Sequence, residues 1–243
     1  MSRVTHGGAL SELQGLAPLE VLRWAYANHG RVAIVASFQV ESSVLIHMAS
    51  QVVERPEVVT LDTGRLPQET HDLIDLATAG DRIALHVQAP DAHELAELAA
   101  AHGANPFYRS VELRRLCCDV RKSRPLARAL QGFDAWVTGL RREQSETRAA
   151  TPIVAADRAH SGIAKIAPLA CWTSEQVWTY VREHEIAYHR LYDHGYTSIG
   201  CAPCTRATKP GEDERAGRWS WEMGAVKECG LHWTPAGRPE RAR

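Results

Sequence analysis

Six cysteines are spread unevenly along this chain of 243 residues, and the spacing of four of them indicates metal chemistry. Cys117 and Cys118 are adjacent, and Cys201 and Cys204 enclose two other residues. A C-x-x-C pair can offer two thiolates to one metal, and a second pair completes the four soft ligands that zinc or an iron–sulfur cluster prefers. Adjacent cysteines suit a zinc ribbon poorly, because neighbouring side chains diverge. The two pairs therefore favour an iron–sulfur cluster.

The same cysteines also allow a simpler interpretation. Cys117 and Cys118 could be ordinary buried thiols, while Cys201 and Cys204 form a redox dithiol or one half of a structural zinc site. Cys171 belongs to neither pair, and we expect it to be a packed thiol of the core.

The sixth cysteine, Cys229, lies in a polar segment near the end of the sequence. Lys227 and His232 flank it, and cations of this kind lower the pKa of a thiol and favour the nucleophilic thiolate. A buried structural thiol fits this polar setting poorly. The sequence therefore predicts that Cys229 is a nucleophile.

Composition limits the classes of protein to which the chain can belong. Its length suits one large α/β domain, or one such domain with a tail, and its 44% hydrophobic content is ordinary for a globular protein with a core. Its formal net charge of −1 argues against a broad surface for nucleic acid. No apolar stretch is long enough to span a bilayer, and residues 1–15 lack the pattern of a secretory signal. We therefore expect a cytoplasmic protein with reduced cysteines and no membrane partner.

Strand-like and helix-like segments alternate along most of the chain, which predicts an α/β fold with a doubly wound, mostly parallel sheet. The expected strands are residues 32–37, 58–62, 83–87 and 135–139. The expected helices are residues 18–29, 44–48, 67–77, 92–102 and 173–182. Thr173 should cap the last helix, with Gln176 as its capping-box partner. Ligands of such sheets bind beyond the carboxyl ends of the strands, so the polar turns there are the candidate sites.

The periodicity fades after residue 204, where glycine, proline and charged residues dominate. We therefore expect residues 1–204 to form the α/β domain and to carry the four paired cysteines. Residues 205–243 should form a C-terminal tail or lid that carries Cys229.

Seven segments together resemble one family, the bacterial assimilatory adenylyl-sulfate (APS) reductases, which are the iron–sulfur type of the phosphoadenylyl-sulfate reductases. The first is a polar turn with SF at 37–38 and SS at 42–43. The others are LDTG (61–64), CCDVRK (117–122), TGLRREQS (138–145), GYTSIGCAPC (195–204), RAGRW (215–219) and KECGLH (227–232). The first two segments are weak on their own, the last five together are the most specific, and the match spans most of the chain.

This resemblance implies a fold like that of the adenine-nucleotide α-hydrolases and a role in assimilatory sulfate reduction. It implies that Cys229 attacks the sulfur of APS, that AMP leaves, and that thioredoxin or a similar thiol releases sulfite from the cysteine S-sulfonate. It also implies a [4Fe-4S] cluster on the two cysteine pairs. A homo-oligomer is expected as well.

The resemblance places a phosphate-binding turn after the first strand, where backbone N–H groups and hydroxyls at a helix start would hold an anion. Ser37, Ser42 and Ser43 are the candidates. Gln39 stands where the family usually has glycine, and Ser42 and Ser43 replace a common Glu-Asp type. Plain helix capping is the other interpretation of these serines.

The remaining contacts implied by the resemblance involve charged side chains. Asp62 would face the nucleotide at a strand end, and Lys122 would approach both the cluster thiolates and the sulfate end of the substrate. Guanidinium groups suit phosphate and sulfate oxygens, which makes candidates of Arg148, Arg215 and Arg218. His232 would either contact phosphate or shield Cys229. Solvated surface charge is the usual alternative for an arginine.

Three other functions compete with this interpretation. A reductase that prefers the 3′-phosphorylated nucleotide (PAPS) typically lacks the cluster cysteines, so the four retained here favour APS, although use of both nucleotides remains open. A zinc-bearing module for nucleic acid or protein would need no nucleophile. An ATP-pyrophosphatase would carry a Ser-Gly-Gly pattern in the first loop, which this chain lacks.

Overall fold

The structure is a computed structural model that describes residues 13–222 and Glu228. Its six strands are β1 (Val32–Ala36), β2 (Glu57–Leu61), β3 (Ala84–Gln88), β4 (Ala135–Val137), β5 (Val154–Asp157) and β6 (Ile163–Ile166). Its α-helices are α2 (Pro18–Asn28), α3 (Val40–Ser50), α4 (Gln68–Thr78), α5 (Ala92–His102), α6 (Val111–Cys118), α7 (Arg124–Ala129) and α8 (Ser174–Glu183). A π-helical turn over Asp119–Ser123 joins α6 to α7.

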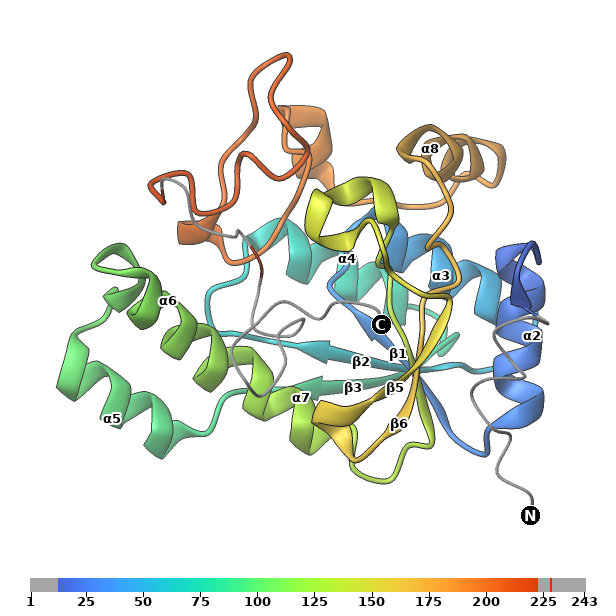
Figure 1. The fold of residues 1–243 in the computed structure, drawn as a ribbon, viewed down its shortest axis with the longest axis horizontal. Helices are drawn as coiled ribbons and strands as arrows, with labels where there is room; N and C mark the ends of the chain where they lie inside the picture. Colours follow the sequence, from blue (N-terminus) through green and yellow to red (C-terminus); the bar gives the residue numbers. More distant parts are fainter. Residues whose placement is uncertain (1–12, 223–227, 229–243) are drawn as a thin grey trace.

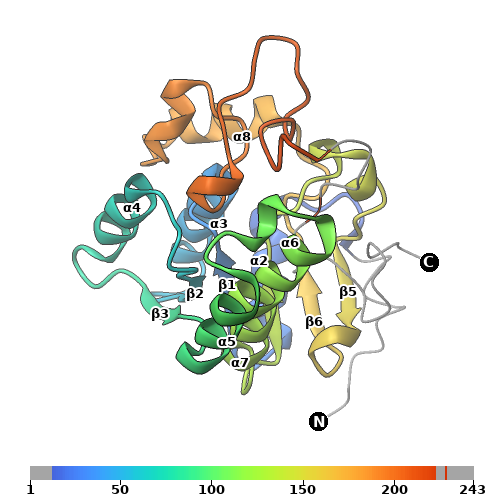
Figure 2. The ribbon, with the colours of Figure 1, turned by 90° about the vertical axis from the view of Figure 1, so that its left-hand side faces the viewer.

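The six strands form one sheet in the order β3-β2-β1-β4-β6-β5. The pairs β3-β2, β2-β1, β1-β4 and β4-β6 are parallel, and only β5 runs antiparallel to its neighbour. Helices lie on both faces, with α3 and α4 on one side and α5 and α7 on the other (Figures 1 and 2). The predicted α/β class and the doubly wound, mostly parallel sheet are therefore confirmed.

Two apolar cores hold these layers together. On one face, buried residues of α2, α3 and α8 pack against the sheet, and Val21, Leu22 and Val44 are fully buried. On the other face, Leu126 of α7 packs against Trp136 of β4. Strands buried on both faces read as continuous apolar runs, which is why β1 was recognisable in the sequence.

The sequence prediction was wrong about two features of these elements. Helix α3 begins at Val40 rather than at residue 44, so Ser42 and Ser43 lie in its first turn and not in the loop before it. Polar residues in a first helical turn resemble a loop when only the sequence is read. The strands β5 and β6 were missed, because both are short and Lys165 interrupts the apolar run of β6.

Helix α8 confirms the predicted cap. The Thr173 hydroxyl accepts a hydrogen bond from the Gln176 backbone N–H at 3.2 Å, and the Gln176 side chain accepts one from the Thr173 N–H at 2.8 Å. Beyond residue 204, the described part of the chain up to residue 222 holds turns and one isolated bridge, between Thr205 and Arg218.

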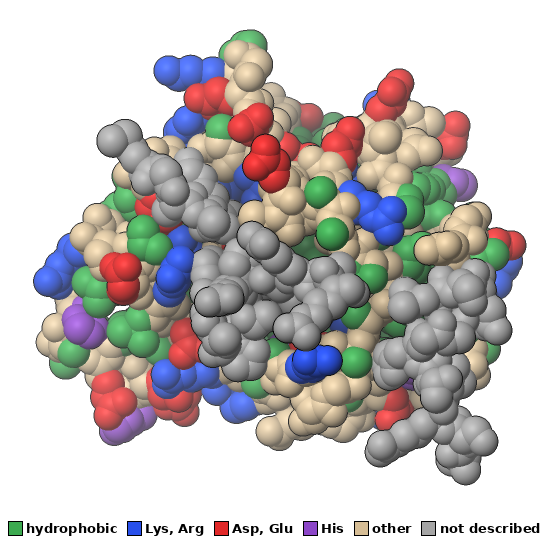
Figure 3. All heavy atoms as spheres, in the orientation of Figure 1, with side chains coloured by type: hydrophobic (Ala, Val, Ile, Leu, Met, Phe, Trp, Pro, Cys, Tyr) green, Lys and Arg blue, Asp and Glu red, His purple; other side chains and the backbone are tan. Residues whose placement is uncertain are grey.

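Side chains of both charge signs are interspersed over the face seen in Figure 3, in keeping with the net charge of −1. In the part of the chain that the structure describes, no helix combines the length and the apolar character needed to cross a membrane.

The edge strand β5 ends in a buried carboxylate that offers a test of stability. Asp157 accepts a hydrogen bond from Trp136 Nε1 at 2.9 Å, and its Oδ2 lies 2.7 Å from His160 Nδ1. Burial alone would raise the pKa of Asp157, but His160, Lys165 and Trp136 together lower it. The stabilisation that this carboxylate provides is therefore present above its ordinary pKa of about 4 and is lost as the pH falls through the lowered value.

We expect Asp157→Ala to lower the free energy of unfolding by about 3 kcal/mol at neutral pH, because buried partners lose their acceptor. Urea titration followed by circular dichroism measures this loss. Glu97→Ala is the control, since the Glu97 side chain is 68% exposed, and it should change stability by less than about 0.5 kcal/mol. Equal losses in the two variants would contradict the assignment of Asp157 to the stabilising core.

Candidate active site

A cavity of about 140 Å³ opens where the strand order reverses, between β1 and β4. We call it the switch-point cavity. Residues at the carboxyl ends of three strands line it, among them Ser37 after β1, Thr60 in β2 and Thr138 after β4. This edge of a doubly wound sheet is where such folds bind their ligands. The position of the cavity is thus the one expected from the topology.

The turn after β1 supplies the first wall of the switch-point cavity. Ser42 Oγ accepts a hydrogen bond from the Ser37 backbone N–H at 3.1 Å, and both residues line the cavity. Phe38 between them is buried and has a φ of +54°, a strained value for a bulky residue and one that often marks a functional turn. Ser43 is buried and is absent from the cavity wall.

Gln39, at the position where the family resemblance leads one to expect glycine, links this turn to a distant segment. Its Nε2 donates to Ser37 Oγ at 3.1 Å, and its Oε1 accepts from the Ile199 backbone N–H at 2.7 Å. Ile199 lies two residues before Cys201. The Gln39 side chain therefore holds the switch-point cavity against the segment that carries the second cysteine pair.

In the turn after β2, the neighbouring residues Asp62 and Thr63 differ in whether they line the switch-point cavity. The Asp62 carboxylate accepts a hydrogen bond from the Gly64 N–H at 2.8 Å, and Gly64 has a φ of +65°, a conformation that glycine adopts readily. Asp62 is absent from the lining of the switch-point cavity, whereas Thr63 lines it. Thr63 Oγ1 also lies 3.3 Å from Cys201 Sγ, a contact that the sequence did not predict.

The four paired cysteines come together in a second, small cavity, which we call the cysteine cavity. Cys117 and Cys118 end helix α6, and Cys201 and Cys204 bound a single 3-10 turn. A hydrogen bond of 2.8 Å from the Ala202 N–H to the Arg65 carbonyl helps to hold this turn in place. The other lining residues are Arg65, Phe107, Arg114, Arg121 and Lys122. All four cysteines are buried.

Burial and nearby cations act in opposite directions on these thiols. Burial raises the pKa of Cys117, although Arg121 opposes the shift. Burial and Cys201 raise the pKa of Cys204 to about 12, against the influence of Lys122 and Arg218. These raised pKa values favour the protonated thiols of Cys117 and Cys204, so a metal bound there would have to displace their protons. Among the described residues, no group of three or more His, Cys, Asp or Glu side chains is arranged to hold a single metal ion.

Lys122 lines both the switch-point cavity and the cysteine cavity. It lies in the π-helical turn that directly follows Cys118. Arg218 lines the switch-point cavity, donates from Nη1 to the Ile199 carbonyl at 3.2 Å and stacks 4.7 Å from the centre of the Trp219 ring. A Cβ at position 200 would collide with this guanidinium, so any residue other than glycine there would have to displace the Arg218 side chain. Lys122 and Arg218 place positive charge where the two cavities meet.

Arg148 and Arg215 line the switch-point cavity, as their predicted role requires, and both also contact Glu228. Arg148 donates from Nε and Nη2 to the Glu228 carboxylate, at 2.9 Å in each case. Cys229 follows Glu228 directly in sequence. Cys229 and His232 themselves lie outside the described residues, so their predicted roles remain predictions.

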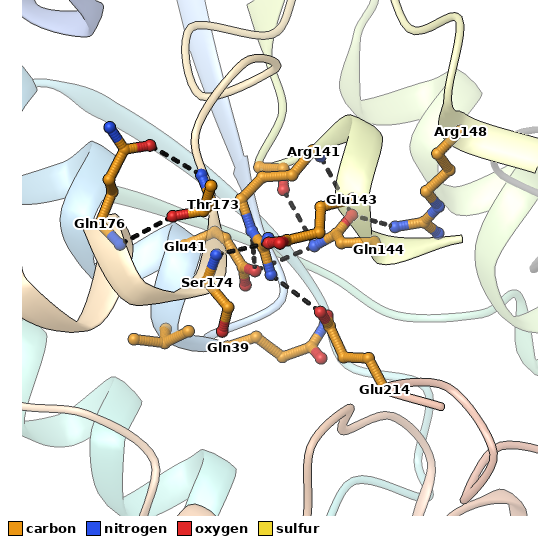
Figure 4. Close-up of polar contacts among 12 residues, drawn as sticks. Gln39, Glu41, Arg141, Glu143, Gln144, Arg148, Thr173, Ser174, Gln176 and Glu214 are labelled. Carbon is orange, nitrogen blue, oxygen red and sulfur yellow. Dashed lines mark hydrogen bonds and ion pairs between the residues drawn. The ribbon is translucent and has the colours of Figure 1, made fainter. Parts of the chain in front are cut away.

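A buried ion network, shown in Figure 4, forms another wall and was missed by the sequence analysis. Arg141 donates from Nε to Glu41 at 2.9 Å and from Nη2 to Glu214 at 3.0 Å. Gln144 also donates to Glu41, at 2.9 Å, and both Glu41 and Gln144 line the switch-point cavity. Glu41 lies in the first turn of α3 and is one of the buried residues of that helix. The helical periodicity of this segment was the one signal in the sequence that could have indicated its burial.

The prediction for Cys171 was wrong, because its thiol is exposed rather than packed in the core. It lies in the turn that precedes α8, where Pro168, Leu169 and Ala170 are buried instead. An exposed thiol outside both cavities makes Cys171 a useful control for experiments on the other cysteines.

Comparison with known proteins places this geometry in context. The phosphoadenosine phosphosulfate reductase domain matches residues 31–207. The adenosine 5′-phosphosulfate reductase of Allochromatium vinosum is 46% identical over 218 residues, which cover 89% of this chain and 84% of that protein. The crystal structure of a phosphoadenylyl-sulfate (PAPS) reductase from Candida auris, a phosphate complex, has a TM-score of 0.72 at 29% identity and covers 84% of this chain and 99% of that one.

A more distant solved structure shares the fold alone. Yeast FAD synthetase in complex with FAD has a TM-score of 0.55 at 12% identity, over 85% of this chain and 70% of that one. The fold is therefore common to proteins whose sequences have diverged widely.

Proposed function

The chain belongs to the phosphoadenosine phosphosulfate reductase family, and we propose that it reduces adenosine 5′-phosphosulfate (APS) to sulfite and AMP in sulfate assimilation. The observation that carries this proposal is that the switch-point cavity and the cysteine cavity share Lys122 as a lining residue. A nucleotide bound at the switch point would thus present its sulfate near a positive charge and near the four thiols.

The proposed chemistry takes place at Cys229. Its thiolate attacks the sulfur of APS, so that a sulfur–sulfur bond forms while the bond from sulfur to the phosphate oxygen breaks and AMP leaves with the electron pair. A thiolate of thioredoxin, or of a similar dithiol, then attacks Cys229 and expels sulfite. The second thiol of the reductant resolves the mixed disulfide, so the dithiol is oxidised as the sulfur is reduced.

The residues of the switch-point cavity would hold the nucleotide. Ser37 and Ser42, at the start of α3, fit the phosphate, whereas Ser43 and Asp62 would act from outside the cavity wall. Lys122, Arg148, Arg215 and Arg218 offer cationic donors to sulfate and phosphate oxygens. His232 would join them from the C-terminal segment. Residues 205–243 would serve as the lid over residues 1–204.

The cysteine cavity fits a [4Fe-4S] cluster held by Cys117, Cys118, Cys201 and Cys204. The fit rests on the four buried thiols and on the cationic side chains of Arg65, Arg114, Arg121 and Lys122 around them, which would compensate the charge of thiolate ligands. A cluster of several iron atoms needs more space between its ligands than a single ion. When bound, the cluster would fix the four ligands and add its own electrostatic field beside the sulfate site.

We further propose a cytoplasmic homo-oligomer that works with thioredoxin and needs no nucleic acid or membrane. Size-exclusion chromatography with light scattering tests the oligomeric state. A monomer at micromolar concentration would contradict it.

The test of the proposed function is a comparison of initial rates with APS and PAPS, each with thioredoxin and a means to regenerate it. We expect AMP and sulfite in equal amounts and a specificity constant at least tenfold higher for APS, equivalent to about 1.4 kcal/mol. The reason is that the cysteine set fits a cluster, a feature that the PAPS type typically lacks. A tenfold preference for PAPS would overturn the choice of substrate, and the absence of sulfite with either nucleotide would overturn the function.

A further inference from the structure

Glu228, the residue directly before Cys229, is buried and is held by several charged and polar side chains. Its side chain is only 3% exposed. Arg148 binds both carboxylate oxygens at 2.9 Å, and Arg215 Nη2 lies 3.6 Å from one of them. A carboxylate is buried at such a site only when cations and hydrogen-bond donors compensate for the lost water.

Two hydroxyls and a third arginine also contact Glu228. Thr147 Oγ1 donates to its carboxylate at 2.9 Å and Ser145 Oγ at 3.4 Å. Arg114 Nη1 donates to its backbone carbonyl at 2.8 Å. Both the side chain and the backbone of Glu228 are therefore held in place.

Arg114 ties this anchor to the cysteine cavity. It lies in helix α6 one turn before Cys117, it is fully buried, and it lines the cysteine cavity. Its Nε and Nη2 bind the two Glu222 carboxylate oxygens at 2.9 Å each, and its guanidinium stacks 4.4 Å from the centre of the Trp219 ring. The helix that ends in two cysteines thus holds the C-terminal segment at two points, Glu222 and Glu228.

We infer that Glu228 is a positioning residue for the proposed reaction, and that its carboxylate restrains the peptide joined to Cys229 by binding two arginines of the switch-point cavity. One peptide bond separates the anchored residue from the proposed nucleophile, so the anchor limits the distance that the thiol can move. This inference rests on the proposed function, because it assigns Glu228 a part in that reaction.

The shared arginines give the inference a distinctive signature. Arg148 and Arg215 line the switch-point cavity, where the anionic oxygens of a nucleotide would compete with the Glu228 carboxylate for them. Removing the charge of Glu228 should therefore leave nucleotide binding unchanged or make it tighter, while the reaction at Cys229 slows. A residue that merely stabilised the fold would weaken both together.

The experiment compares Glu228→Gln and Glu228→Asp with the wild type in a single turnover with APS, without reductant. Mass spectrometry follows the S-sulfonate on Cys229. We expect Glu228→Gln to slow its formation at least tenfold, because a displacement near 1 Å can cost about a hundredfold in rate. Glu228→Asp keeps the charge on a shorter arm and should give an intermediate rate.

APS binding is measured separately by calorimetry, in Cys229→Ser and in Cys229→Ser combined with Glu228→Gln, so that no reaction follows binding. We expect the Kd of the double variant to equal that of Cys229→Ser or to be lower. Glu212→Gln is the matched control, since Glu212 forms a bidentate pair with Arg206 in the same segment, at 2.8 and 3.0 Å, away from both cavities. It should form the S-sulfonate at the wild-type rate.

A wild-type rate in Glu228→Gln, or an APS Kd that rises in parallel with the loss of rate, would overturn the positioning role. If wild-type protein formed no S-sulfonate on Cys229, the proposed function itself would fail, and this inference would fail with it. The two failures are therefore distinguishable from the wild-type sample alone.

Discussion

Cys229→Ser should abolish the reduction of APS, with a loss of at least about a thousandfold in kcat, while APS binding and the iron content remain. Removing a nucleophile costs rates of this order or more, because the serine hydroxyl is a much weaker nucleophile than a thiolate. Incubation with APS without reductant, followed by mass spectrometry of the digested protein, should find the S-sulfonate on Cys229 in the wild type and on no cysteine of the variant.

Cys171→Ser is the matched control for this experiment. Its thiol is exposed and lies outside both cavities, so the variant should retain wild-type activity and still acquire the S-sulfonate on Cys229. An S-sulfonate on Cys171 in the wild type would contradict the mechanism, as would an active enzyme in which no cysteine is modified.

Removal of residues 205–243 should in addition weaken nucleotide binding, because it deletes Arg215 and Arg218.

Serine at any one of the cysteine-cavity positions should lower the iron content and the activity together. Cys204→Ser is the most informative of the four, since Cys204 is buried and its pKa is already sensitive to Lys122 and Arg218 from the switch-point cavity. We expect a loss of activity of at least about a hundredfold. The reason is that substituting residues that only hydrogen-bond to metal ligands already lowers metal affinity or activity about 10- to 100-fold. Iron and sulfide assays on anaerobically purified protein, with the absorption spectrum, measure the cluster directly.

Two outcomes would contradict the cluster. One is stoichiometric zinc without iron in an active preparation of the wild type. The other is full activity in Cys204→Ser with the iron lost. Cys171→Ser should keep both the iron content and the activity, which separates ligand loss from a general effect of removing a thiol.

Elements with a strong and regular pattern could be predicted from the sequence alone. Helix α5 occupies Ala92–His102, as expected from its helical spacing, and the central strands were recognisable because burial on both faces leaves continuous apolar runs. The strand β6 could not be predicted in this way. Lys165 is buried there and lies 5.2 Å from the centre of the Trp136 ring, a contact that depends on the folded sheet.

The candidate site likewise contains features that the sequence could predict and features that it could not. Sequence spacing was enough to group the four cysteines, and the structure brings them into one cavity. It was not enough to decide between Ser42 and Ser43, because consecutive residues of a helix point in different directions and only Ser42 reaches the cavity. The burial of Arg141 between Glu41 and Glu214 was also invisible, since a charged residue in a loop is usually exposed.

The cysteine cavity draws its four cysteines from two segments that the ribosome makes at different times. Cys201 follows Cys118 by 83 residues, an interval of roughly 4 to 16 seconds at typical rates of synthesis. During that interval the first two thiols exist in the nascent chain without the other pair. The interval between Thr63 and Cys201, which contact each other, is longer still. Arg114 is made 114 residues before Glu228, whose carbonyl it binds. Assembly of the proposed cluster on all four cysteines would therefore have to follow synthesis of the Cys201 segment.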